Sequence, residues 1–252
     1  MGSRHEGQQS AGDCPEKVTL KYALTYYDHS ENLWQEGEMR ELLKLWEESF
    51  RKQGWEPVVL CKEDVKTHPR FDFFFEHFNS KPTEYPRTFT NACWLRHLAA
   101  AHFGNLHNEN VALFDMDVIC YGMEPRDPEP GKMEVLCSEP PASIFLGAVL
   151  GSPTHFLDLC ELFVAWKPDE LDFIQRLGIY HQDDLSMFVR MFHPLPNDAA
   201  RPKPEWLIKS PGCALFDYSN YRTEKLVHFG SGAMKARGCW PKHHFIEAIR
   251  PF

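Results

Sequence analysis

The distribution of apolar and polar residues over the first sixty positions predicts a β-α-β unit. Residues 18–27 are rich in β-branched and aromatic side chains, which is typical of a strand. Between Glu38 and Lys52 the apolar residues recur at helical spacing, and Gly54 follows as a stop signal. Residues 57–61 form a short apolar run that favours a buried parallel strand. This order is the opening of a doubly wound α/β layer.

The middle of the chain continues the same alternation of helices and strands. A helix is expected to begin at Thr88 or Thr90 and to run to about His102, with Gly104 ending it. Residues 110–122 then form an apolar strand interrupted by two aspartates. Further strands are expected within 135–137, 144–150, 213–217 and 225–229, and further helices within 154–166 and 182–192.

The start of the chain differs from the rest because it is polar and has no pattern of apolar residues. Residues 1–16 have no apolar face and are expected to be a disordered leader. The 252-residue chain contains no convincing linker or repeat after that point, so residues 17–252 are predicted to form one mixed α/β domain.

Charge and cysteine usage narrow the classes of function. The 36 acidic residues outnumber the 27 Lys and Arg residues, giving a net charge of −9 that disfavours a nucleic-acid partner. Because no apolar run is long enough to span a bilayer and no signal peptide is evident, no transmembrane segment is expected. The eight cysteines are scattered without a CxxC pair, which favours reduced thiols. We therefore expect a soluble, cytoplasmic protein.

Asp115 and Asp117 are the strongest chemical signal in the sequence. They are two residues apart on a segment expected to be extended, so their side chains would leave the same face of the strand. Four apolar residues precede them, which places the pair at the carboxyl edge of a strand, where open α/β sheets bind ligands. With no basic residue nearby in sequence, the pair favours Mg²⁺ or Mn²⁺, which often bridge phosphates. The alternative is that one aspartate caps a turn and the other faces water.

The segment Phe114-Asp115-Met116-Asp117-Val118 resembles the DxD motif of the GT-A glycosyltransferases, because it follows a β-α-β opening and a helix. The resemblance implies a single Rossmann-like domain with a mixed, mostly parallel central sheet flanked by helices. It also implies that Asp115 and Asp117 hold Mn²⁺ or Mg²⁺ and that this ion clamps the diphosphate of a UDP-sugar or GDP-sugar. Met116 would then lie beside the nucleotide.

Residues 226–235 are similar to the late His-x-x-Gly-x-x-Lys element of retaining members of that family. The similarity implies that His228 is a third metal ligand and that Gly230, Gly232 and Lys235 contact the diphosphate. One extra residue separates His228 from the Gly-x-x-Lys unit, and no Pro-Trp follows the lysine. The choice between a retaining and an inverting reaction therefore stays open.

Asp183 and Asp184 begin a predicted helix and resemble the acidic stretch that lines the acceptor side in many GT-A enzymes. One of them, with Asp184 slightly favoured, would act as a general base or would stabilise an oxocarbenium-like centre. The alternative is that both acids only complement the helix dipole.

Four further residues are expected near the donor nucleotide. Thr25, Tyr26 and Tyr27 end the first strand, where the base and ribose usually lie in this fold, and Arg96 is placed to reach a phosphate or a base edge. Strand-end tyrosines and solvated helix arginines are common, and this is the alternative interpretation. His243 and His244 are interpreted as surface residues.

The resulting hypothesis is a metal-dependent glycosyltransferase that moves a sugar from a nucleotide-sugar donor to a glycan or another hydroxyl acceptor. One alternative is a haloacid-dehalogenase-like, Mg²⁺-dependent phosphatase with Asp115 as nucleophile, although 114 residues precede that aspartate. A second alternative is a non-catalytic module that binds a nucleotide-sugar.

Overall fold

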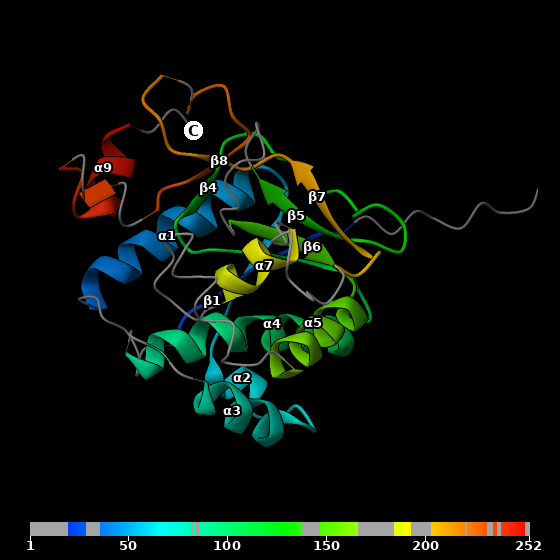
Figure 1. Cartoon of the computed structure of the whole chain (residues 1–252). Coiled ribbons are helices and arrows are strands. Elements are labelled where there is room, and N and C mark those ends of the chain that lie inside the picture. Colours follow the sequence, from blue (N-terminus) through cyan, green and yellow to red (C-terminus); the bar gives the residue numbers. More distant parts are fainter. Residues whose placement is uncertain are drawn as a thin grey trace, which may run out of the picture.

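The computed structural model is built around a central six-stranded sheet (Figure 1). It describes residues 20–28, 36–81, 83, 86–137, 147–165, 184–192, 203–219, 221–230, 234–235 and 238–249, so the expected leader lies outside the described residues. The strand order is β2-β1-β3-β6-β5-β7. The strands are β1 (Tyr22–Tyr26), β2 (Glu56–Leu60), β3 (Val111–Phe114), β5 (Met133–Cys137), β6 (Ala148–Gly151) and β7 (Leu207–Pro211).

The pairing directions confirm the expected mixed, mostly parallel sheet. Strands β2 and β3 both run parallel to β1, and β7 runs parallel to β5. Strand β6 is antiparallel to both of its neighbours, β3 and β5. The β-α-β opening predicted from the sequence is therefore present, because β1, α1 (Glu36–Lys52) and β2 follow one another with β1 and β2 parallel.

A second, three-stranded sheet lies next to the first and has the order β4-β9-β8. Its strands are β4 (Val118–Cys120), β8 (Ala214–Leu215) and β9 (Leu226–His228). Strand β4 follows β3 after a three-residue turn and pairs antiparallel with β9, with Val118 opposite His228. This pairing brings a late segment of the chain to the carboxyl end of β3.

Helices cover both faces of the central sheet (Figure 1). Helix α4 (Arg87–His107) and helix α5 (Pro153–Ala165) pack together on one face, and α1 packs on the other. The shorter helices are α2 (Lys62–Val65), α3 (Phe71–Ser80), α7 (Asp184–Phe192) and α9 (Lys242–Ala248). Helix α9 packs against α1, beside the small sheet.

Buried aromatic side chains anchor the end of β3. The ring of Phe114 lies 4.4 Å from that of Phe50 on α1 and 5.6 Å from that of Trp55, and all three side chains are buried. Burying side chains of this size contributes roughly 1.5–3 kcal/mol each. The packing of these rings therefore fixes the position at which the segment after Phe114 begins.

Two helix and strand expectations are wrong in detail. Strand β2 is parallel as expected, but it is the edge of the sheet, and of its five residues only Leu60 is buried. Gly104 does not end α4, which continues to His107 and ends at Asn108 in the left-handed conformation, with φ of 54°. Gly104 instead allows α5 to approach, since a Cβ there would lie 2.7 Å from Cγ of Pro153.

Some elements were missed, and others were assigned too broadly. Strand β7 and helices α2 and α9 have no strong apolar period and were not expected, while the strand expected within 213–217 has only two residues. Strand β7 closes an edge of the sheet and ends at Pro211, which an edge strand tolerates because its outer N–H groups need no partner. Residues 144–146 and 182–183 lie outside the described residues.

Candidate functional site

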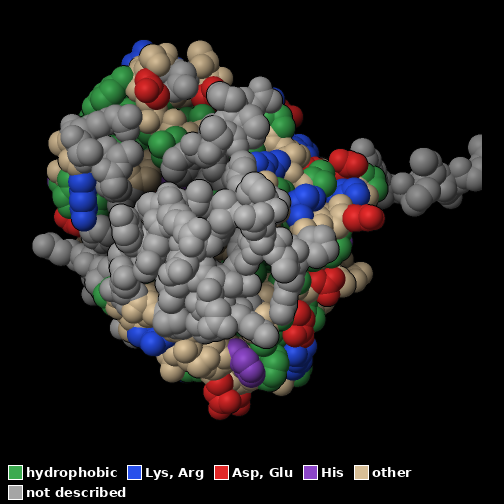
Figure 2. Space-filling view, viewed as in Figure 1, with side chains coloured by type: hydrophobic (Ala, Val, Ile, Leu, Met, Phe, Trp, Pro, Cys, Tyr) green, Lys and Arg blue, Asp and Glu red, His purple; other side chains and the backbone are tan. Residues whose placement is uncertain are grey.

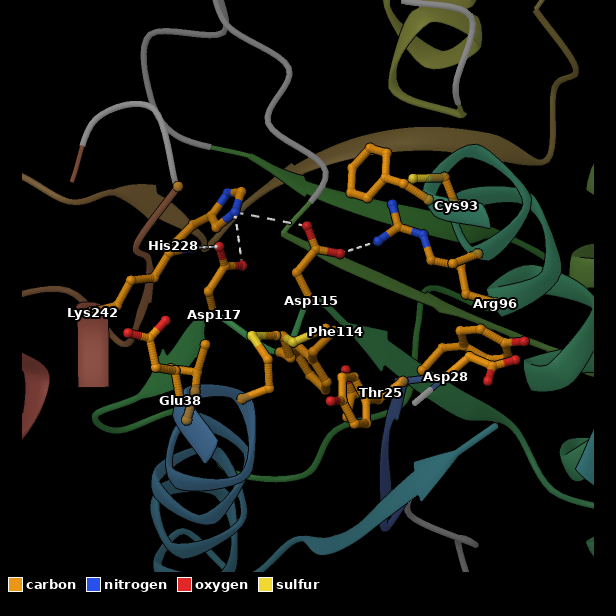
Figure 3. Close-up of a pocket in the computed structure, with 18 of the residues that line it drawn as sticks. Thr25, Asp28, Glu38, Cys93, Arg96, Phe114, Asp115, Asp117, His228 and Lys242 are labelled. Carbon is orange, nitrogen blue, oxygen red and sulfur yellow. Dashed lines mark hydrogen bonds and ion pairs between the residues drawn. The ribbon is translucent and has the colours of Figure 1, made fainter. Parts of the chain in front are cut away.

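Asp115 and Asp117 lie in a tight turn between β3 and β4. The N–H of Val118 donates to the carbonyl of Asp115 at 3.0 Å, which closes the turn. The expectation that both aspartates lie on one face of an extended strand is therefore wrong. The prediction that the pair directly follows the buried strand at its carboxyl end is confirmed. The turn changes the chain direction, and the two carboxylates point into the same cavity (Figure 3).

Gly147 contacts this turn through a backbone hydrogen bond and a close approach. Its carbonyl accepts the N–H of Asp115 at 3.0 Å. A Cβ at Gly147 would lie 2.7 Å from Sγ of Cys213 and 3.2 Å from Cγ2 of Val118, and both of these neighbours are buried. The close approach therefore needs a glycine, and it sets the position of the first carboxylate.

His228 reaches the carboxylates from the end of β9. The N–H of the next residue, Phe229, donates to the carbonyl of Asp117 at 2.8 Å, which ties β9 to the turn. Nε2 of His228 then lies 3.1 Å from Oδ1 of Asp117 and 3.7 Å from Oδ2 of Asp115. One ligand atom from each of the three residues lies within 4.8 Å of the others, a cluster that could hold a metal ion.

Two basic side chains already contact the carboxylate pair. The guanidinium of Arg96 on α4 donates to Oδ1 of Asp115, and the ammonium of Lys242 on α9 donates to Oδ2 of Asp117 (Figure 3). Both cations come from segments remote in the sequence, 19 and 125 residues away. The sequence showed no basic residue next to the pair, because the two cations that compensate it are brought there by tertiary contacts.

Arg96 is itself held in place by a buried carboxylate. Oδ2 of Asp184 accepts Nε of Arg96 at 2.7 Å and lies 2.7 Å from Nε2 of His97. Oδ1 of the same carboxylate accepts the N–H of Leu185 at 3.0 Å. The side chain of Asp184 is 2% exposed and that of His97 is fully buried. Both Asp184 oxygens thus have partners within the protein.

Electrostatics favour charged forms for most of this cluster. Burial opposes the charge on Arg96, but Asp115 and Asp184 together raise its pKa above the ordinary value. Burial would raise the pKa of Asp117, but Lys242 and His228 lower it below its usual range, and Arg96 and His97 lower that of Asp184. The pKa of His97 falls, chiefly because the ring is buried.

The pKa of His228, unlike that of His97, is raised. Burial lowers it, but the carboxylates of Asp117 and Asp115 raise it above 6.5 overall. A cation is therefore favoured at the position between the two aspartates, whether it is a proton on His228 or a metal ion.

The carboxylates, His228 and both basic residues line a cavity of about 310 Å³. The structure brings most of the sequence-predicted site residues to this cavity: Thr25, Tyr26, Tyr27, Arg96, Asp115, Met116, Asp117, Asp184, His228 and Gly230. Thr25, Tyr26 and Tyr27 are almost fully buried where β1 ends. Residues distributed from 25 to 230 in the sequence therefore share one space.

Three expected residues are not placed in the cavity. Lys235 is not among the residues that line it, and its ammonium lies 4.8 Å from the ring centre of Trp240. Asp183 and Gly232 lie outside the described residues. The interpretation of His243 as a surface residue is wrong, because it is buried and lines the cavity, whereas His244 is exposed.

Sequence reasoning also missed several residues of this cavity. Lys242, Asp28, Glu38 and Cys93 line it, and His97 supports it through Asp184. The only signal for His97 was its position next to Arg96 on a helix, and Lys242 follows a proline without any motif. These residues become recognisable only when the tertiary contacts are known.

The face shown in Figure 2 carries Lys and Arg side chains interspersed with Asp and Glu among its described residues. No continuous basic stripe is visible on the described part of that face. Among the helices that the structure describes, none combines the length and the apolar character that a bilayer span requires.

No family model and no curated protein matches this chain in sequence. The solved structures that are similar to it in fold include two glycosyltransferases. A glycosyltransferase involved in glycosylation of the major capsid of PBCV-1 aligns with 87% of this chain and 98% of its own, with 13% identity and a TM-score of 0.46. Mouse xyloside xylosyltransferase 1 aligns with 84% of this chain and 98% of its own, with 9% identity and a TM-score of 0.47. At this level of similarity, function has to be inferred from the side chains of the site.

Proposed function

We propose that this protein is a metal-dependent glycosyltransferase that moves a sugar from a UDP-sugar or GDP-sugar to a glycan or another hydroxyl acceptor. The observation that carries the proposal is the convergence of Asp115, Asp117 and His228 at one cavity, at the carboxyl end of a central strand. That edge is where open α/β sheets bind ligands. The same cavity reaches the end of β1, which provides space for a nucleoside.

The donor set fits a divalent ion. Two carboxylates and one imidazole lie within 4.8 Å of one another, and the adjoining cavity leaves room for water or phosphate oxygens. Carboxylate-rich sets suit Mn²⁺ and Mg²⁺, and the imidazole favours Mn²⁺ over Mg²⁺. When bound, such an ion stabilises the negative charge that develops on a departing diphosphate.

The protein supplies further positive charge at the same point. Arg96 and Lys242 both line the cavity and already contact the two carboxylates, so both cations are present at the cavity before a donor binds. Positioned cations in a partly buried site stabilise a leaving anion more than the same charges would in water. A nucleoside diphosphate is the leaving group that these charges would serve.

We propose that the nucleoside binds where β1 ends. Thr25, Tyr26 and Tyr27 line the cavity there, and Met116 extends the apolar wall from the turn. An aromatic ring offers a stacking surface for a base. Gly230 lines the same cavity two residues after His228, whereas Lys235, the other diphosphate contact expected from the sequence motif, is not among the residues that line it.

We propose a positioning role for Asp184. Its carboxylate reaches the cavity wall, but one oxygen binds Arg96 and His97 and the other binds a helix N–H. A carboxylate with these partners orients Arg96 more readily than it accepts a proton from an acceptor hydroxyl. Asp183 remains the other sequence candidate for acceptor chemistry. An Asp184→Asn variant that loses activity only through a raised donor KM would support positioning over proton transfer.

The experiment that tests the function is a titration with UDP-, GDP- and dTDP-sugars, with and without Mn²⁺, followed by melting temperature and by sugar transfer or hydrolysis. A ligand at a hundred times its dissociation constant adds about 2.7 kcal/mol to stability, which is a readily measured shift. We expect a Mn²⁺-dependent shift that is lost in Asp117→Ala. A shift with no hydrolysis and no transfer would instead favour a binding module.

The phosphatase alternative makes a different prediction for the same protein. It requires Asp115 to be a free nucleophile, whereas this carboxylate binds Arg96 and lies beside His228. No response to any nucleotide-sugar, together with labelling of Asp115 by a phosphoryl donor, would contradict the transferase proposal.

A further inference from the structure

Lys242 contacts the carboxylate that the proposed metal ion needs. Its ammonium donates to Oδ2 of Asp117, while Nε2 of His228 lies 3.1 Å from Oδ1 of the same carboxylate. The side chain of Lys242 is 6% exposed and that of Asp117 is 13% exposed. Both oxygens of Asp117 are therefore engaged when no metal ion is bound.

A divalent ion at this cluster has to compete with that ammonium. The ion would take an oxygen of Asp117 together with Asp115 and His228, which places a double positive charge next to Lys242. Two positive charges that bind the same carboxylate repel each other strongly in a partly buried site. Metal binding is therefore expected to displace the Lys242 ammonium from Asp117.

The displaced ammonium then needs another anion. Lys242 lines the cavity, so it can turn into that space without leaving the site. An ammonium left buried without a counter-charge is unfavourable, and the diphosphate of a donor would provide the counter-charge. Glu38, which also lines the cavity, is the protein's own competing acceptor for this ammonium.

We propose that Lys242 couples metal binding to diphosphate binding: it holds Asp117 in the metal-free protein and moves to the diphosphate when the metal ion arrives. This inference rests on the proposed function. Metal alone should bind weakly, and metal and nucleotide should strengthen each other's binding by the same factor, because such coupling is reciprocal. Lys242 is thereby a positioning residue whose effect is measurable without turnover.

The test compares the wild-type full chain with its variants. Mn²⁺ binding is measured without nucleotide, by electron paramagnetic resonance of free Mn²⁺. UDP and GDP binding is then measured by calorimetry with and without Mn²⁺. The variants are Lys242→Gln, which removes the cation, and Lys242→Arg, which retains it. Lys132→Gln is the matched control, because Lys132 is a partly exposed lysine just before β5, outside the cavity, and its ammonium donates to the backbone carbonyl of Glu205 at 3.0 Å.

We expect Lys242→Gln to bind Mn²⁺ alone at least about fivefold more tightly than the wild type, the lower end of typical coupling strengths. The strengthening of nucleotide binding by Mn²⁺ should fall by a similar factor, while Lys242→Arg and Lys132→Gln retain it. Melting without metal shows whether each variant is folded. If Glu38 takes the ammonium instead, Glu38→Gln will weaken Mn²⁺ binding without nucleotide, and the coupling to diphosphate is contradicted.

The failure of this inference can be distinguished from failure of the proposed function. If Lys242→Gln binds Mn²⁺ alone no more tightly than the wild type, while the wild type still shows Mn²⁺-dependent donor binding, only the role of Lys242 is overturned. If the wild type binds neither UDP- nor GDP-sugars with Mn²⁺, the proposed function fails and the role of Lys242 fails with it.

Discussion

The two carboxylates of the site are each paired with a basic side chain, but the two basic side chains are held in different ways. Arg96 belongs to the long helix α4 and binds Asp184, which is in turn bound by His97. Lys242 belongs to the seven-residue helix α9 and reaches Asp117 through a flexible four-carbon chain. The Arg96 side of the site is a buried network, whereas Lys242 has one charged partner, Asp117, among the described residues.

This difference indicates which part of the site is a framework and which part can respond to ligands. A planar guanidinium with two carboxylate partners loses both if it moves, so Arg96 is expected to stay in place. A lysine with one charged partner can exchange it for another anion at little cost. We therefore expect Arg96 variants to affect stability and Lys242 variants to affect mainly ligand binding.

The largest expected effect is on stability, from Arg96→Met. It leaves the carboxylate of Asp184, which is 2% exposed, without its main counter-charge. Removing one partner of a buried ion pair typically costs about 3–5 kcal/mol. Chemical denaturation should show this loss, and Arg96→Met combined with Asp184→Leu should recover part of it. A loss below about 1 kcal/mol would contradict the description of the Arg96 side as a framework.

The next largest effect is expected from Gly147→Ala. The added methyl group meets Cys213 and Val118, and overpacking of this kind costs about 1–3 kcal/mol. Because Gly147 also binds the N–H of Asp115, Mn²⁺ affinity should fall as well. Gly122→Ala is the matched control, since a Cβ there meets nothing within 4 Å. Equal melting temperatures for the two variants would contradict the close approach, and Cys213→Ala should partly rescue Gly147→Ala.

Lys242→Met is expected to cost less stability without metal than Arg96→Met, because His228 still contacts Asp117 and can supply a counter-charge when it is protonated. The comparison with Arg96→Met is made in the same denaturation experiment. A loss as large as that of Arg96→Met would mean that both sides of the site are framework.

The stability of the metal-free protein and its affinity for Mn²⁺ should depend on pH in opposite directions. The folded-state pKa of His228 is raised above 6.5, so its protonation stabilises the metal-free protein below that pH. This contribution is lost as the pH rises through the folded-state pKa. A bound ion needs the neutral imidazole, so Mn²⁺ affinity should instead rise with pH, by up to about tenfold per unit below that pKa.

Calorimetric Mn²⁺ titrations from pH 5.5 to 8 would measure this dependence. His228→Gln should bind Mn²⁺ more weakly and should lose most of the pH dependence. If the dependence is unchanged in His228→Gln, His228 is not a metal ligand.

The sequence predicted the scaffold better than it predicted the charges of the site. Helix α1 and strand β1 have clear apolar periods, and the structure places them within a few residues of their predicted bounds; β3 begins one residue after its predicted start but ends well before its predicted end. The Asp115–Asp117 turn was mistaken for a continuous strand because apolar residues flank it on both sides. These flanking runs belong to two different sheets, which local periodicity cannot show.

The candidate ligands could be predicted because a motif marked them, but their partners could not. Asp115 and Asp117 are adjacent to a strand, and His228 lies in a recognisable element. Lys242 and His97 act through contacts that span 125 and 87 residues of sequence, and each is one unremarkable residue in its own helix. The pairing of each carboxylate with a cation is therefore a property of the tertiary structure.

The most direct test of the central claim is a crystal structure with Mn²⁺ and UDP or GDP, with the ion located by its anomalous scattering. We expect an anomalous peak bound by Asp115, Asp117 and His228, with a diphosphate oxygen on the ion and Arg96 still paired with Asp184. An ion bound elsewhere, or a diphosphate bound in the cavity without contact to these three residues, would contradict it.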